Sequence, residues 1–342
     1  MSPPPDPSQI FQIGMGFFAS KVLLSAVELK LFTTLGQQPA TCQELARSLA
    51  LNGRGLQDFL DALVSLGLLE RQGNGDGARY SNSAHAAMFL DRASPHYLGG
   101  FLEMANARLY RFWGHLTEAL RSGKPQNEIK ETGGKELFEA LYSDQQRLEN
   151  FLAAMAAVQQ GNFAVLAETF DFSKHRSMCD VGGASGALAM AVARRHPRVT
   201  CISFDLPQVT AVARRAIAAQ GLSERVILKE GSFFDDPLPK ADVITMGNIL
   251  HDWGLETKKM LIRKAYDALP QGGCFIAIEN VIDDDRRKNT FGLLMSLNML
   301  IETNDGFDYT HAQFHSWCLE AGFRATELKP LAGPASAAIA HK

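Results

Sequence analysis

The second half of the chain alternates short apolar runs with stretches in which apolar residues recur at helical spacing. The apolar runs end near Gly183, Asp205, Gly231 and Leu250, and a fifth run covers 274–282. The helical stretches are 186–196, 209–221, 256–269, 290–302 and 310–321. Such alternation is typical of a parallel sheet with helices on both faces. We therefore predict an α/β fold with a Rossmann-like, doubly wound sheet, ending in two antiparallel strands at 323–328 and 336–341.

The amino-terminal part of the chain follows a different pattern. Apolar residues recur at helical spacing over 17–35, Thr41 caps a second helix that runs to Leu49, and a third helix covers 55–66. Two short strand-like runs, 68–71 and 79–81, then flank a glycine-rich loop and predict a hairpin. Three helices followed by a hairpin are typical of a winged-helix module.

A winged helix serves either to bind DNA or as a dimerisation platform. The third helix, which would read DNA, offers Arg54 and Gln57 beside Asp58 and Asp61, and little else that could contact phosphates. We therefore favour dimerisation, with a DNA-binding regulator as the alternative. The predicted domains are a winged-helix-like dimerisation domain at 1–95, a helical linker contributing to the substrate pocket at 96–172, and a cofactor-binding catalytic domain at 173–342.

Composition narrows the location and the partners. The chain has 342 residues, which is more than one hydrophobic core usually holds, and its net charge of −3 gives no reason to expect a nucleic acid or an anionic membrane as partner. The five cysteines are scattered, without metal-ligand or disulfide spacing. Residues 1–8 do not resemble a secretory signal, and no apolar run is expected to reach the roughly 18 residues of a membrane span. We expect a cytoplasmic protein without a metal.

A turn of small residues, Asp180-Val181-Gly182-Gly183-Ala184-Ser185-Gly186, lies where the first strand ends and a helix begins, the position at which α/β proteins bind nucleotides. Asp205 ends the next strand, 19 residues after the last glycine, where a carboxylate can bind both hydroxyls of a ribose. The G-x-G-x-x-G dinucleotide fingerprint fails in both registers. A small-residue turn without that fingerprint suits S-adenosylmethionine, which carries a ribose and an adenine but no pyrophosphate.

Three later segments add candidate chemistry at the same edge of the sheet. Gly231-Ser232-Phe233 follows the third strand and brings an aromatic ring that could lie against adenine. His251 follows the fourth strand, and histidine is well suited to remove a proton near neutral pH. Glu279 ends the fifth strand in an apolar run, where an unpaired charge is costly, so we expect it to bond one imidazole nitrogen of His251. Asp308 is a weaker candidate because it lies in a loop between two helices.

These segments, together with Phe204-Asp205-Leu206-Pro207, His251-Asp252-Trp253 and the stretch 299–310, resemble the S-adenosylmethionine-dependent small-molecule O-methyltransferases of the caffeate and acetylserotonin type. The resemblance implies a class I methyltransferase sheet behind an amino-terminal dimerisation domain, and a homodimer whose partner helps to close the pocket. It implies His251 as general base, Glu279 as the carboxylate that orients it, and Asp308 at a second acidic position usually filled by glutamate. The predicted cofactor contacts are Asp180, Gly182, Gly183, Gly186, Asp205, Leu206, Gly231, Ser232, Phe233, Asn248 and Tyr142. The predicted substrate contacts are Met155, Met299 and Thr303.

The sequence departs from the family pattern at several of these positions. Ala184 replaces a third glycine, Ser232 stands where aspartate is common, and Gly247 and Asn248 stand where relatives often carry a basic residue. We interpret these departures as changes in how adenine is held. The predicted reaction is methyl transfer to a hydroxyl of a small aromatic molecule. Transfer to a small thiol or amine, or a non-methylating reaction of the same cofactor fold, are the alternatives within this fold.

Overall fold

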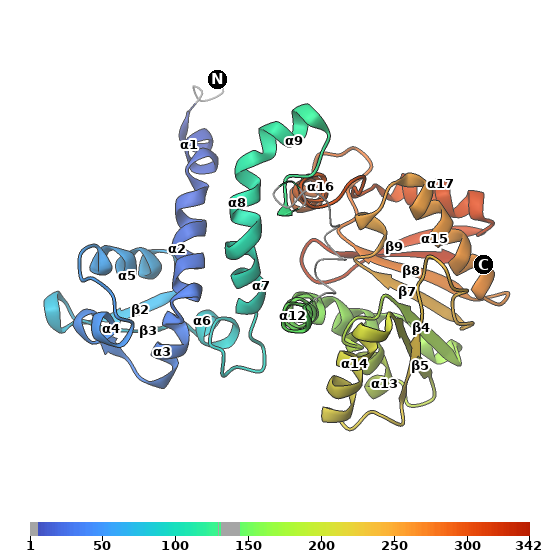
Figure 1. The fold of residues 1–342 in the computed structure, drawn as a ribbon, viewed down its shortest axis with the longest axis horizontal. Coiled ribbons are helices and arrows are strands. Elements are labelled where there is room, and N and C mark those ends of the chain that lie inside the picture. The colour runs from blue at the N-terminus through green and yellow to red at the C-terminus, as the bar shows by residue number, and fades with distance from the viewer. Residues whose placement is uncertain (1–5, 129, 131–143) are drawn as a thin grey trace, which may run out of the picture. The chain divides into compact units, whose positions relative to one another are not determined.

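The chain forms two compact units, Met1–Arg111 and Phe112–Lys342, in a computed structural model that describes residues 6–128, 130 and 144–342 (Figure 1). The division at 111 differs from the predicted three-part division at 95 and 172, in which a separate linker supplies part of the pocket. That linker role remains a prediction. Most of residues 96–172 belong by compactness to the second unit.

The first unit consists of helices around a small antiparallel sheet. Its sheet has the strand order β1-β3-β2, and the predicted hairpin is present, with Leu69 of β2 opposite Asn82 of β3. Thr41 caps α4 as predicted, through a capping box with Glu44. The winged-helix assignment itself remains a prediction. The elements are α1 Ser8–Gly14, α2 Gly16–Glu28, α3 Leu31–Gln37, β1 Ala40–Thr41, α4 Cys42–Ser48, α5 Leu56–Ser65, β2 Leu69–Gln72, η1 Gly75–Gly77, β3 Arg79–Asn82, α6 Ala84–Phe89, α7 Gly99–Met104 and η2 Ala105–Leu109. The short helix α8, Tyr110–Phe112, spans the boundary between the two units.

The single helix predicted over 17–35 is wrong, because the structure divides it in two. Lys30 adopts a left-handed backbone conformation with φ of 56°, between α2 and α3. A left-handed residue cannot continue an α-helix, so the chain turns there. Both helices bury apolar residues against the same core, α2 through Val27 and α3 through Phe32.

The start of the chain is more apolar than predicted. The most apolar 18-residue window within residues 8–28 has a mean hydropathy of 1.6 and is 17% buried, so the length and composition of this stretch would allow a membrane span. The expectation that no stretch reaches this length is therefore wrong. The exposed apolar side chains of α1 and the start of α2 are Ile10, Phe11, Ile13, Met15, Phe17 and Phe18. Contact with another protein chain would bury these apolar side chains as effectively as a membrane would.

The second unit contains the predicted seven-stranded sheet, in the order β6-β5-β4-β7-β8-β10-β9. Strands β4 to β8 pair in parallel, whereas β10 pairs antiparallel with both β8 and β9, which confirms the predicted antiparallel ending. The strands are β4 Ser177–Val181, β5 Thr200–Asp205, β6 Val226–Glu230, β7 Val243–Gly247, β8 Cys274–Glu279, β9 Ala325–Pro330 and β10 Ser336–His341. The helices are η3 Trp113–His115, α9 Leu116–Ser122, α12 Gln145–Thr169, η4 Phe172–Lys174, α13 Ala187–Arg195, α14 Pro207–Ala219, η5 Leu250–Asp252, α15 Leu255–Ala268, α16 Thr290–Glu302 and α17 His311–Ala321.

Helices cover both faces of this sheet (Figure 1). One core joins α12, α13 and α14 to the sheet through residues such as Leu166, Leu188 and Ile217. The other core joins α15 and α17 to the opposite face through residues such as Leu261 and Phe314. The parallel strands are therefore apolar on both sides, as a doubly wound sheet requires. The chain runs from β4 outward to β6 and returns to β7 beside β4, and ligands of such sheets bind at the carboxyl edge beside this reversal.

Candidate active site

The glycine turn at the end of β4 needs its glycines for space as well as for backbone conformation. Gly182 has φ of +69°, and a side chain there would clash with Ile249. A side chain at Gly183 would clash with the hydroxyl of Ser203. The amides of both glycines point to the carbonyl of Phe204, at 2.9 and 3.3 Å. The turn therefore packs closely, with Ile249 and Ser203 filling the space that a side chain would need at these two glycines.

Asp205 is held in place by the same turn. Its Oδ2 accepts a hydrogen bond from the amide of Ala184 at 2.9 Å, and its Oδ1 accepts one from the amide of Leu206 at 2.8 Å. Burial raises the pKa of Asp205 to about 6, against the effect of these two amides. Each carboxylate oxygen keeps a free lone pair, and both are fixed in direction. The side chain is therefore prepared to accept hydroxyl donors such as those of a ribose.

Asp180 lies in the interior rather than at the rim. Its Oδ1 accepts a hydrogen bond from the hydroxyl of Thr245 on β7 at 2.7 Å, and the side chain is buried. Burial raises the pKa of Asp180 to about 7, partly offset by the bond from Thr245. The predicted cofactor contact of Asp180 has no direct support from this geometry. The side chain links β4 to β7 beneath the turn.

The loop after β6 carries the predicted adenine contacts. Gly231 bonds the carbonyl of Asp205 through its amide at 3.0 Å, which fastens the loop beside the ribose position. Lys264 of α15 donates hydrogen bonds to the carbonyls of Phe233 and Phe234, at 2.7 and 2.9 Å. The ring of Phe233 is half-buried, and a side chain at Gly182 would come within 3.9 Å of it. Ser232 caps the following turn by bonding the amide of Phe234, so its hydroxyl is used locally.

Asn248 follows β7 in a left-handed conformation with φ of 51°. Asparagine tolerates this region better than most residues. Its amide bonds the carbonyl of Ile278 at 3.1 Å, while its side-chain Oδ1 is buried without a hydrogen-bond partner among the described residues. An unpaired buried polar atom at this edge is consistent with a ligand contact there.

His251 lies in η5 and is almost fully buried, with 6% of its surface exposed. Its Nδ1 lies 3.5 Å from Oδ1 of Asp308, and its Nε2 lies 3.4 Å from Oδ1 of Asp252. Burial by itself lowers the pKa of the imidazole, but Asp252, Asp308 and Glu279 outweigh it and raise the pKa to about 10. The positively charged imidazolium is therefore the form that this site stabilises in the free protein.

Glu279 does not make the predicted bond to the imidazole ring. Its Oε1 accepts a hydrogen bond from the backbone amide of His251 at 3.1 Å. Glu279 therefore holds the main chain of η5, while Asp308, the weaker candidate by sequence, faces the ring. Burial raises the pKa of Glu279, and that of Asp252 to about 6. Sequence reasoning assigned no role to Asp252, although its place directly after His251 in the quoted motif was a signal.

The predicted substrate contacts are spread over three segments. Met299 is buried on α16, and Met155 is half-buried on α12. The hydroxyl of Thr303 bonds the carbonyl of Met299 and the amide of Gly306, both at 2.9 Å, so it ends α16 and shapes the loop that leads to Asp308. Leu206 packs among apolar residues that include Leu152 of α12. Tyr142 lies outside the described residues. Gly186 directly precedes α13 with φ of 77°, and it shapes the turn through its backbone.

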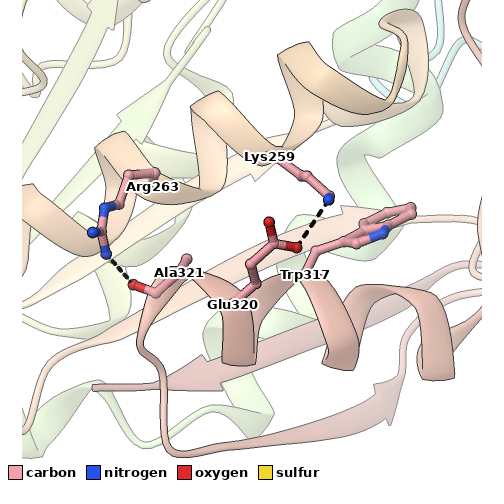
Figure 2. Close-up of a pocket in the computed structure, with 5 residues that line it drawn as sticks. All are labelled: Lys259, Arg263, Trp317, Glu320 and Ala321. Atoms are coloured by element: carbon pink, nitrogen blue, oxygen red, sulfur yellow. Dashed lines mark hydrogen bonds and ion pairs between the residues drawn. The ribbon is translucent and has the colours of Figure 1, made fainter.

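Other parts of the second unit offer less chemistry. Figure 2 shows a small surface pocket between α15 and α17, of about 190 Å³, lined by Lys259, Arg263, Trp317, Glu320 and Ala321. None of the predicted site residues lines it, and its charged groups already bond one another or the backbone, Lys259 to Glu320 and Arg263 to the carbonyl of Ala321. Within the described ranges, no group of three or more His, Cys, Asp or Glu is placed to hold a metal ion.

The chain is similar to known proteins along nearly its whole length. Residues 113–324 match the family model of the O-methyltransferase domain, and residues 11–92 match that of the O-methyltransferase dimerisation domain. Tetracenomycin polyketide synthesis 8-O-methyl transferase TcmO of Streptomyces glaucescens is 40% identical over 98% of this chain and 97% of its own length. The N,N-dimethyltransferase OxyT of Streptomyces rimosus is 33% identical over 96% of this chain and 93% of its own. The crystal structure of human N-acetylserotonin methyltransferase in complex with SAM superposes with a TM-score of 0.90 at 32% identity, covering 100% of this chain and 99% of that one.

Proposed function

The chain belongs to the family of S-adenosylmethionine-dependent O-methyltransferases, and from this premise we propose that it methylates a hydroxyl group of a small aromatic molecule with His251 as general base. TcmO, by its name, is an 8-O-methyl transferase of tetracenomycin polyketide synthesis, and the human neighbour is an N-acetylserotonin methyltransferase. Both therefore support an aromatic acceptor with a hydroxyl for this chain.

S-adenosylmethionine, when bound, supplies a methyl group that its positively charged sulfur already activates. The residues at the carboxyl edge of the sheet fit this cofactor. Gly182 and Gly183 bring a turn without side chains to the carboxyl edge of the sheet, the fixed oxygens of Asp205 can accept ribose hydroxyls, and Phe233 offers an aromatic face for adenine. The unpaired Oδ1 of Asn248 adds an acceptor at the same edge. The remaining work of the protein is to orient the acceptor and to remove its proton.

His251 is placed to take that proton in its neutral form, whose share grows as the pH rises towards the raised pKa of about 10. A phenol has a pKa of about 10 and is mostly protonated at neutral pH, so the oxygen gains nucleophilicity when a base removes its hydrogen. The proton passes from the hydroxyl oxygen to an imidazole nitrogen, and the resulting imidazolium lies among the carboxylates of Asp252, Asp308 and Glu279. These carboxylates stabilise the charge that develops on His251. The acid cluster around the imidazole is the observation that carries this proposal.

The test is His251→Gln, with His85→Gln as the control, since His85 is exposed on α6. We expect His251→Gln to reduce methyl transfer by about 10²- to 10⁴-fold and to leave the affinity for S-adenosylmethionine within a few fold. Transfer is measured with a methyl-labelled cofactor and a panel of naphthols and larger polycyclic phenols. Normal turnover by His251→Gln on the best acceptor would show that the base assignment is wrong.

The similarity to the dimethyltransferase OxyT supports a second candidate, an amine acceptor. A neutral amine attacks through its free lone pair, so it needs less help from a base before methyl transfer. The acceptor panel therefore includes arylamines and thiols. Labelling of an arylamine that persists in His251→Gln would favour this candidate over the hydroxyl.

We further propose that the protein is a cytoplasmic homodimer. Residues 11–92 match a dimerisation domain, and the exposed apolar side chains of α1 and α2, including Phe17 and Phe18, need a cover in water. Mass measurement in solution should give twice the chain mass of 37.4 kDa. The double variant Phe17→Ser/Phe18→Ser should shift the measured mass towards that of the monomer. A monomeric wild-type protein that binds lipid vesicles would instead support a membrane role for residues 8–28.

A further inference from the structure

Lys258 on α15 is fully buried, with 0% of its surface exposed, which is rare for a lysine without charged neighbours. Its Nζ donates a hydrogen bond to the backbone carbonyl of Trp253 and lies 3.6 Å from the centre of the Phe307 ring. The next residue, Lys259, points outward and pairs with Glu320 at 2.9 Å. Neighbouring lysines on one helix are thus placed in opposite surroundings.

The two contacts of Lys258 lie on the two segments that carry the candidate base and its acid. Trp253 comes two residues after His251, and Phe307 comes directly before Asp308. The same segments also pack tightly against each other, because a side chain at Gly306 would lie 2.6 Å from the carbonyl oxygen of Asp252. One buried ammonium group therefore joins η5 to the loop before α17.

The charges around this lysine are mostly negative. The charges of Glu279 on β8, Asp308 in the loop before α17, Asp252 of η5 and, least of the four, the exposed Asp305 raise the pKa of the ammonium group. Burial works in the opposite direction and is the larger effect, so the pKa of Lys258 falls to about 8. The group is therefore mainly charged at neutral pH. In return, it lowers the pKa of Asp252 and of Glu279.

We propose that Lys258 is a positioning residue for methyl transfer: its ammonium group is the internal counter-charge of the acid cluster and fixes the His251 turn against the Asp308 loop. The proposal rests on the proposed role of His251. With Lys258 in place, its positive charge lowers the pKa of Asp252 and of Glu279 beside an imidazole that must gain and lose a proton. Without Lys258, the buried carboxylates lack a positive partner, so the pKa of each group in the cluster, including the imidazole of His251, rises.

The test compares Lys258→Met with Lys259→Met, which removes the same charge one residue away on the outer side of α15. Removing the buried charge should raise the pKa of His251, so the acid limb of the kcat/KM profile should move to higher pH by about one unit or more. We expect no movement for Lys259→Met. The same change should appear when the imidazole of His251 is titrated by NMR in the full protein without an acceptor, with His251→Gln for assignment.

The acceptor-free titration separates this proposal from the proposed function. If His251→Gln methylates normally, the base assignment fails, yet the titration still reports whether Lys258 controls the charge of the cluster. A Lys258→Met protein with a lower melting temperature but an unmoved His251 titration would show that the lysine only packs, and would overturn the proposal.

Lys258→Met could leave the acid cluster too highly charged to fold. The double variant Lys258→Met/Glu279→Gln then decides the question, because it removes one positive and one negative group together. We expect the double variant to fold, with a melting temperature above that of Lys258→Met. A double variant that folds no better than Lys258→Met would contradict the proposed pairing of Lys258 with the acid cluster.

Discussion

Replacing Asp308 by asparagine removes one negative charge 3.5 Å from Nδ1 of His251 and keeps the shape of the side chain. A single opposite charge at such a distance changes a pKa by about 1–3 units. The whole rise of His251, from 6.5 to about 10, is shared among Asp252, Asp308 and Glu279 and is reduced by burial. We therefore assign about 1–2 units to Asp308, which corresponds to about 1.4–2.7 kcal/mol.

The direction of the effect on activity follows from the role of a base. Protonated His251 cannot accept a proton, so activity rises as the pH passes upward through the pKa of the imidazole. Asp308→Asn lowers this pKa, and the acid limb of kcat/KM should move to lower pH by about 1–2 units. The maximal rate should fall, because the imidazolium that forms on proton transfer loses a stabilising charge. At pH values below the wild-type limb, the fraction of neutral imidazole in the variant should rise about tenfold for each pH unit by which the limb moves.

The assay combines pH profiles of labelled methyl transfer with NMR titration of His251, which is identified among the nine histidines by its loss in His251→Gln. Asp305→Asn serves as the control, since Asp305 is an exposed carboxylate on the same loop. An Asp308→Asn protein whose acid limb and imidazole titration both coincide with those of Asp305→Asn would refute the assignment of Asp308 to the ring of His251.

Three other substitutions test the framework of the site. Gly306→Ala should lower kcat at least about tenfold, measured by transfer of the labelled methyl group. Its new methyl group would clash with the carbonyl of Asp252 and displace the loop that carries Asp308. Gly182→Ala should weaken binding of S-adenosylmethionine more than about tenfold in calorimetry, because a left-handed alanine is strained and would collide with Ile249. Burial raises the pKa of Asp180 in the folded protein from 3.8 to about 7, so folding favours the protonated carboxyl. The wild-type protein should therefore lose a few kcal/mol of unfolding free energy as the pH rises from about 4 to about 7, and Asp180→Asn should abolish this loss. Urea unfolding at several pH values measures this difference.

The rim of the sheet could be predicted from the sequence because each of its residues follows an apolar strand. Parallel strands end at one edge, so Gly182, Asp205, Asn248 and Glu279 are brought together by topology alone. Local patterns also gave the antiparallel ending of the sheet. They did not predict that the helix ends at Lys30. The helical spacing of apolar residues continues past Lys30, and the helix ends there because of the left-handed backbone conformation of that residue.

The partner of the imidazole was harder to predict. Strand position places Glu279 near His251, but it does not say whether the carboxylate reaches the ring or the main chain. The structure has it accept the backbone amide of His251, and it brings Asp308 to the ring from a loop. That loop is positioned by tertiary contacts, among them the close approach of Gly306 to Asp252, and no periodic pattern records such contacts.

Lys258 shows the limit of sequence patterns most directly. Lys258 and Lys259 are the same residue type at adjacent positions. On an α-helix, adjacent side chains point in directions about 100° apart, so the two lysines face different surroundings. The apolar residues of α15, Leu261, Ile262 and Ala265, define a buried face that Lys258 shares and Lys259 does not. A lysine on that face is taken for a surface residue unless its partners are known. Those partners, Trp253, Phe307 and the acid cluster, come from other segments of the second unit. Only the folded chain therefore shows that this lysine belongs to the site.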